Sequence, residues 1–299
     1  MNVLMDLTVS TLIQGLIYGL IAYGVYITYK ILDFPDLTVD GSFPLGAAVT
    51  AVLLSKGSNP FITIPAALIA GAIAGLATGI IHVKFNIRDL LSGIIVQTAL
   101  FSVNLKIGGS NLIIPREIDT IFTSGPVMAL FGDMPLMYRK LIVVVIIAIL
   151  VKIVLDIYFK TKSGLLLRAV GDNSSLVTTL AKDSGTVKII GLVIANALVA
   201  AAGCLVCHEQ RAFSSTMGMG QVVFGLAAVI IGTTIFKRMG FVKGTTAAVI
   251  GAVIYKACIM IAISMGLDAN LLNLVTAVLF LIILVLGNRS KKGKVKANA

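Results

Sequence analysis

"KILDFPDLTVDGSFPLGAAVTAVLLS", residues 30–55, decides how this chain folds, because it begins as a polar stretch and ends as an apolar one. The apolar part, 43–55, would form a helix only about 20 Å long at about 1.5 Å per residue. The hydrocarbon core of a bilayer is about 30 Å thick, and crossing it takes about 20 apolar residues. The polar part contains Asp33, Asp36, Asp40 and Pro35. This pattern predicts a helix that is broken at membrane depth, or one that dips in from one surface.

Eight further segments have the length and composition of membrane spans. The chain of 299 residues is 58% hydrophobic and 12% charged, which is too apolar for a soluble protein and too poor in charge for a disordered one. The segments are 7–29, 62–83, 89–109, 139–159, 187–208, 220–236, 244–264 and 270–287. We therefore expect an all-α integral membrane protein, a polytopic bundle of about eight or nine transmembrane helices with one or two of them broken or re-entrant. We expect a single domain over residues 1–299.

The basic residues predict the orientation of the chain in the membrane. With the N-terminus outside and 43–55 counted as a crossing, sixteen Lys and Arg fall in cytoplasmic loops and the tail, against five in external loops. The positive-inside rule favours this orientation. It places 160–185 and the basic tail 288–299 in the cytoplasm. Anionic lipid headgroups account for the net charge of +11, so we expect no nucleic-acid partner.

Two short stretches echo one another in the two halves of the chain. "GSFPLGAA" starts at Gly41 and "GQVVFGLAA" at Gly220, and each has Gly, four residues, Gly and then small residues. Paired interruptions of this kind are typical of transporters built from repeat-like halves. The alternative is that Gly and Ala are simply common in packed membrane helices.

Polar side chains inside the spans must face protein or water. They are Gln14, Gln97, Asn104, Asn196, Gln221 and Asn273. Each could serve only as a hydrogen bond between helices, but we expect Asn104 and Asn196 to line a path at mid-depth. Helix starts near Ser42 and Gln221 would direct positive dipole ends inward, which suits the carboxylate of a solute. The predicted path residues are therefore Ser42, Asn104, Asn196 and Gln221.

The three aspartates are expected elsewhere. An Asp at the centre of a membrane helix costs about 2.5 to 3.5 kcal/mol on insertion scales. We therefore expect Asp33, Asp36 and Asp40 at the cytoplasmic mouth of the path.

Motifs for catalysis, metals and nucleotides are weak or missing. "CLVCH", from Cys204 to His208, matches a c-type haem attachment motif, but it lies in a continuous apolar stretch that leaves no room for a porphyrin. A zinc site has no evident fourth ligand, since the other histidine is His82. The single Gly-Lys pair lies in the tail and is followed by Val, so it is no P-loop. We expect no catalytic residue, metal or cofactor in this chain, and any ATP would bind a partner subunit.

"SGLLLRAVGDN", residues 163–173, reads as a short helix outside the membrane. Ser163 is a candidate N-cap, and Gly171 a candidate left-handed stop. Asp172, Asn173 or Ser174 could then cap a second short helix. The helix would carry an apolar patch of Leu165, Leu166, Leu167 and Val170 with Arg168 beside it. The alternative is an amphipathic helix that rests on the lipid surface.

This stretch resembles the coupling segment of permease subunits in the ABC importer family for branched-chain amino acids and ribose. "FPDLTVDGSFPLGAAVTA" is similar to the start of a subgroup of aromatic amino acid importers, of tryptophan and tyrosine type. The resemblance implies that the cytoplasmic helix docks in a cleft of a separate ATPase. Its coupling residues would be Gly164, Arg168, Ala169, Gly171, Asp172 and Asn173. Relatives usually follow the Asn with an Ala-rich turn, whereas this chain has "LVTT" at 176–179.

The resemblance also implies the partners and the function. We expect a multi-pass permease in a bacterial-type plasma membrane, working as a homodimer with ATPase subunits and an extracellular substrate-binding lipoprotein. It would form the translocation path for an amino acid or a similar small solute. The alternatives are a secondary transporter with inverted repeats and, from another class, a membrane enzyme or haem-carrying redox protein.

Overall fold

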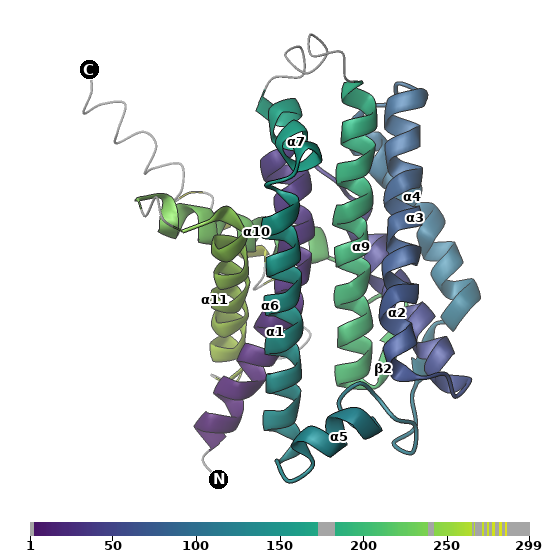
Figure 1. The fold of residues 1–299 in the computed structure, drawn as a ribbon, viewed down its shortest axis with the longest axis vertical. Coiled ribbons are helices and arrows are strands. Elements are labelled where there is room, and N and C mark those ends of the chain that lie inside the picture. Colours follow the sequence, from purple (N-terminus) through teal and green to yellow (C-terminus); the bar gives the residue numbers. More distant parts are fainter. Residues whose placement is uncertain are drawn as a thin grey trace.

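The computed structural model is an elongated bundle of helices, shown in Figure 1. It describes residues 3–172, 183–238 and 242–264, with scattered positions between 266 and 285. The long helices are α1 (Val3–Val25), α3 (Thr63–Lys84), α4 (Asp89–Gly108), α6 (Leu136–Tyr158), α9 (Ser184–Gln210) and α11 (Gly244–Ser264). The shorter elements are η1 (Tyr26–Ile31), α2 (Val39–Ser55), η2 (Pro60–Ile62), α5 (Gly125–Phe131), α7 (Lys162–Asp172), α10 (Gln221–Ile235), η3 (Phe236–Arg238) and the strands β1 (Asn111–Ile113) and β2 (Ala212–Ser214).

The membrane spans largely follow the expected segments. Within the described residues, six helices are long and apolar enough to cross a membrane, and α2 and α10 are shorter apolar helices. The first span includes a π-helical turn, η1, which extends α1 to Ile31. The expected segment 270–287 lies mostly outside the described residues, as do 173–182 and the tail 288–299. The prediction of an all-α polytopic membrane protein is confirmed.

α2 is the broken helix that the sequence predicts. Its start lies beside the middle of α9, where Ser42 bonds to Asn196, and its end packs near Cys207 at the end of α9. Residues 32–38 lead from η1, at the end of the bundle that holds α7, down to this start. The stretch 30–55 therefore runs from the α7 end of the bundle to the opposite end and does not turn back.

α10 is the second interrupted helix, and it runs the opposite way. It starts beside Asp40 of α2 and runs toward the α7 end, where Gly232 packs against Ala247 near the start of α11. The sequence predicts nearly a full span over 220–236, whereas the helix has 15 residues and is about 22 Å long at about 1.5 Å per residue. The two half-helices match the sequence echo at Gly41 and Gly220, with opposite directions.

α3 and α9 are held together by close backbone contact. Gly71, Gly75 and Gly79 lie on one face of α3, and a Cβ added at Gly71 or Gly75 would overlap the backbone of α9. Small residues let membrane helices approach in this way, so that van der Waals packing stabilises the pair. α2 packs against this pair, with Gly46 close to the backbone of Ala200 in α9.

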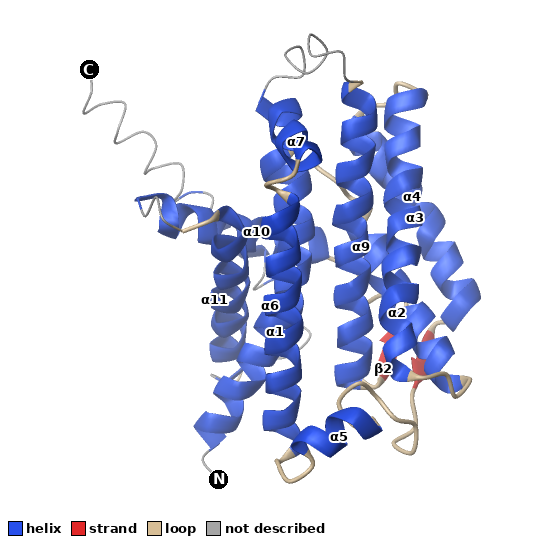
Figure 2. Cartoon of the chain, viewed as in Figure 1, coloured by secondary structure: helices blue, strands red, loops and turns tan. Residues whose placement is uncertain are grey.

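The end opposite α7 carries the irregular structure, including a two-stranded sheet in an otherwise helical molecule (Figure 2). β1 pairs antiparallel with β2, with Leu112 opposite Phe213. Nearby, the Nζ of Lys140 on α6 lies 3.3 Å from the Oε1 of Glu209 on α9. The sheet and the ion pair tie the loops before α6 to the end of α9. Nothing in the sequence pattern predicted this sheet.

Candidate functional site

The break before α2 is held by a buried hydrogen-bond network. The Nδ2 of Asn196 donates to the Oδ2 of Asp36 at 2.7 Å, and the Oδ1 of Asn196 accepts from the Ser42 hydroxyl at 2.6 Å. Asp36 also accepts from the backbone N–H of Thr38 at 2.9 Å. All three side chains of the network are at most 3% exposed. The network fixes the start of α2 against the middle of α9.

Asp40 occupies the start of the other half-helix. Its Oδ1 accepts from the backbone N–H of Val222, in the first turn of α10, at 2.8 Å. Unpaired N–H groups and the helix dipole stabilise an anion at this position. The expectation that this positive helix end is free for the carboxylate of a solute is therefore wrong for α10, because Asp40 already fills it.

The predicted location of the aspartates is also wrong for two of the three. Asp36 and Asp40 lie at the junction of α2, α9 and α10, away from the mouth of the bundle. Their hydrogen bonds to an amide side chain and to a helix N-terminus offset the cost of burial that argued against this place. Asp33 is exposed and has a left-handed φ of 52°.

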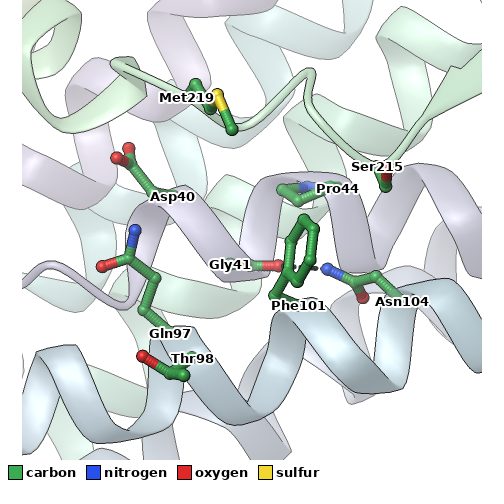
Figure 3. Close-up of a pocket in the computed structure, with 9 residues that line it drawn as sticks. All are labelled: Asp40, Gly41, Pro44, Gln97, Thr98, Phe101, Asn104, Ser215 and Met219. Carbon is green, nitrogen blue, oxygen red and sulfur yellow. Dashed lines mark hydrogen bonds between the residues drawn. The ribbon is translucent and has the colours of Figure 1, made fainter. Parts of the chain in front are cut away.

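A cavity of about 360 Å³ lies beside this junction, between α2, α4 and the loop before α10. Figure 3 shows the lining residues, which are Asp40, Gly41, Pro44, Gln97, Thr98, Phe101, Asn104, Ser215 and Met219. The Nδ2 of Asn104 donates to the carbonyl of Gly41 at 3.1 Å, across the floor of the cavity. The buried Oδ1 of Asn104 has no hydrogen-bond donor among the described residues. A donor from a water or a solute would satisfy it.

The four predicted path residues gather around this junction in two roles. Asn104 lines the cavity. Ser42 and Asn196 are fully buried in the network and brace the break instead. The Nε2 of Gln221 donates to the carbonyl of Met217 at 3.0 Å, while its buried Oε1 has no partner among the residues described.

Sequence reasoning missed Asp36, Asp40 and Gln97 as parts of this site. The usable signal was the spacing of the two aspartates, four residues apart just before a helix that is too short to span. Gln97 was noted as an intramembrane polar residue, but only the structure brings it beside Asp40 at the cavity.

The expected coupling segment forms α7, with different ends from those predicted. The Oγ1 of Thr161 accepts from the N–H of Gly164 at 3.3 Å, so Thr161 caps the helix, and Ser163 lies within its first turn. Gly171 is helical and is no left-handed stop. Its missing Cβ matters for another reason, because a Cβ there would overlap the carbonyl oxygen of Ile31 in η1.

The apolar patch of α7 points mostly inward. Leu167 and Val170 are 0% and 3% exposed and pack against η1 and the residues that follow it. Leu165 is 56% exposed, and the guanidinium of Arg168 lies 5.0 Å from the ring centroid of Phe159.

The other expected coupling residues lie around the same helix. Gly164 is buried, and it lies so close to the Tyr158 carbonyl that a Cβ there would overlap it. Ala169 is half-buried. Asp172 ends the helix, and Asn173 lies outside the described residues.

His208 in the "CLVCH" motif serves packing. Its Nε2 is 2.8 Å from the Oγ1 of Thr63, and its Nδ1 accepts from the N–H of Ile121 at 3.4 Å. Cys204 and Cys207 are buried beside it as free thiols. These contacts join α9 to the start of α3.

Comparison with known proteins places the chain among transport permeases. Residues 7–286 match the family model described as the permease component of branched-chain amino acid transport systems. The chain is similar to the tyrosine transport system permease protein of Clostridioides difficile, 39% identical over 280 residues, which cover 94% of this chain and 91% of that protein. It is also similar to the ribose import permease protein RbsC of Escherichia coli, 26% identical over 73% of this chain and 66% of that protein. With the family model covering nearly the whole chain, this protein belongs to the branched-chain amino acid transport permease family.

Proposed function

We propose that this chain is the membrane subunit of an ATP-binding cassette importer for an amino acid or a similar small solute. A separate cytoplasmic ATPase drives it, and an external binding protein supplies the solute. Two copies form the complete path, with each N-terminus outside and each C-terminus in the cytoplasm of a plasma membrane. Residues 160–185 receive the ATPase.

The observation that supports this proposal is the close packing of α7 against η1. Gly171 lies against the carbonyl of Ile31, and the chain from Ile31 leads within five residues to Asp36. Asp36 is bonded to Asn196 on α9. Closely packed interiors transmit displacement with little compression. A movement of α7 by a partner would therefore reach the helix break and the cavity beside it.

The solute class rests on the relatives and on the polar junction. The relative in Clostridioides difficile is named for tyrosine transport, and the family model for branched-chain amino acids. The cavity beside Asp40 is lined by amide and hydroxyl groups. Polar groups at this depth in a membrane cost free energy, and they usually serve binding or transport. This arrangement supports a path for a small polar solute.

The second candidate is a secondary transporter with inverted repeats, which the opposite directions of α2 and α10 favour. Purified chain in proteoliposomes distinguishes the two. Uptake that requires the ATPase subunit and ATP supports the importer, whereas uptake by the chain alone supports the secondary transporter.

Charge reversal on the outer face of α7 tests the coupling. Arg168 is exposed, and Arg168→Glu should leave the permease inserted while lowering ATPase association and ATP-dependent uptake by about tenfold. Inverting a charge inside an interface costs more than inverting one at its rim. Lys84→Glu, an exposed reversal at the end of α3 on the same side of the bundle, is the matched control. Normal uptake by Arg168→Glu would remove α7 as the coupling element.

A further inference from the structure

Lys256 is a cation in the middle of α11, and neither the network nor the cavity described above involves it. Its Nζ lies 3.3 Å from the ring centroid of Tyr18 on α1 and 5.4 Å from that of Phe224 on α10. The side chain is half-buried where these three helices meet. A charged residue at this depth is costly and usually serves transport or binding.

The ammonium group has no hydrogen-bonding partner in the part of the chain that the structure describes. Two other lysines in the spans are paired: Lys152 with Asp156 at 3.1 Å, and Lys140 with Glu209 at 3.3 Å. No described residue accepts a hydrogen bond from Lys256 or forms an ion pair with it. The contact with the Tyr18 ring face stabilises the charge, but it leaves the N–H donors without an oxygen acceptor.

The rings around Lys256 form a continuous, largely buried aromatic cluster. Tyr18 and Phe224 meet edge to face at 5.2 Å between centroids, and Phe224 and Tyr255 do so at 5.1 Å. Tyr18 also contacts Phe43 of α2, with centroids 5.8 Å apart. The cluster, in which Phe224 and Tyr255 are 5% and 1% exposed, therefore reaches from α11 to the half-helix α2.

The position of Phe224 links Lys256 to the helix break. Phe224 lies in the first turn of α10, two residues after Val222, whose N–H is bonded to Asp40. The positive end of α10 is thus already neutralised by the protein's own carboxylate. Lys256 is the cation beside the same helix start, and the carboxylate that acts on it from a distance, Glu209, is already paired with Lys140.

We propose that Lys256 binds the carboxylate of the transported amino acid, with the ring face of Tyr18 beneath the ammonium group. A carboxylate supplies the acceptors that the ammonium lacks, and the ion pair is strong where water is excluded. The assignment rests on the proposed function and specifies the chemistry that the path selects.

The test uses the full importer in proteoliposomes, with permease, ATPase and binding protein. Uptake of the twenty amino acids is measured first, and the best-transported one becomes the probe. Its decarboxylated amine, such as tyramine for L-tyrosine, serves as competitor. The wild type should prefer the amino acid, Lys256→Met should lower its uptake at least tenfold, and Lys256→Arg should retain most of it.

Two controls separate binding from folding. Lys106→Met removes an exposed lysine near the end of α4 and should leave uptake unchanged. Tyr18→Ala removes the ring face beneath the ammonium group and should lower uptake, whereas Tyr18→Phe keeps the ring and should lower it less. Basal ATP hydrolysis and the elution volume in detergent report on assembly. If Lys256→Met does not assemble, Lys256→Gln replaces it, with the same expected loss of uptake.

The outcomes are distinguishable. Normal uptake and an unchanged preference over the amine in the uncharged Lys256 variant would overturn the inference while leaving the importer intact. A wild-type complex that takes up no amino acid would overturn the proposed function, and the inference would fall with it. Selective loss of uptake in an assembled complex supports both.

Discussion

Replacing Asn196 with alanine should destabilise the protein, because its buried hydrogen-bonding partners would be left unsatisfied. The side chain makes three hydrogen bonds, to Asp36, to Ser42 and to the Leu192 carbonyl. A hydrogen bond to a charged group contributes about 1.5 to 3 kcal/mol, and a buried polar group left unsatisfied costs about 1 to 3 kcal/mol. Together these losses lower the free energy of unfolding by about 3 to 5 kcal/mol. The corresponding fall in Tm is about 6 to 20 °C, from about 2 to 4 °C per kcal/mol in chains of comparable size.

The assay is thermal unfolding of the detergent-purified permease, followed by the fraction that remains monodisperse after heating. Asn59→Ala is the control, because Asn59 accepts a hydrogen bond from Phe61 at 3.0 Å in an exposed place, and its loss should cost only about 1 kcal/mol. The decisive comparison is a double-mutant cycle. In an Asp36→Asn background, Asn196→Ala should cost only about 1 to 2 kcal/mol, because no buried charge loses its partner. Equal costs in both backgrounds would refute the reasoning.

Four further outcomes are expected. Single cysteines at Ser58 and Leu165 in a cysteine-free background should react with impermeant reagents from outside and from the cytoplasm, respectively, and reversed labelling would invert the proposed orientation. Gly75→Leu should prevent α3 from packing on α9 and lower the yield of monodisperse protein, whereas a normal yield would contradict the close contact. Gly171→Val should separate α7 from η1 and reduce ATP-dependent uptake without affecting insertion. Unchanged uptake would show that the contact between α7 and η1 does not transmit movement from the ATPase. Asn104→Leu should block transport while sparing basal ATP hydrolysis, and normal transport would place the path away from the cavity.

Much of the fold could be predicted because hydrophobic length is a local property. Six full-length apolar helices and the short α2 can be found from segment length alone. For α10 the predicted segment 220–236 lies close to the observed Gln221–Ile235, but its contact with α2 could not be predicted. The break there depends on Asp40, a residue of another helix. Pairing between β1 and β2 also depends on residues about 100 positions apart, which no local pattern reveals.

The site was predicted only in part, because the sequence shows the free-energy cost of burying an Asp but not the hydrogen bonds that offset it. The insertion cost of an Asp is real, but Asn196 and the N-terminus of α10 offset it for Asp36 and Asp40. Gly171 shows the same limit. Its residue type indicates a place that needs glycine, but the requirement comes from contact with Ile31 and not from the φ angle.

The bond between Asp36 and Asn196 also has a consequence for biosynthesis. Its partners are 160 residues apart in the chain. Ribosomes add about 5 to 20 residues per second, so Asp36 leaves the ribosome about 8 to 30 s before the amide that will pair with it. During that interval the stretch around Asp36 has no partner on α9 and is poorly suited to the hydrocarbon phase. The first half of the permease can therefore complete its fold only after α9 has been synthesised, and a chain truncated before α9 should be degraded instead of accumulating in the membrane.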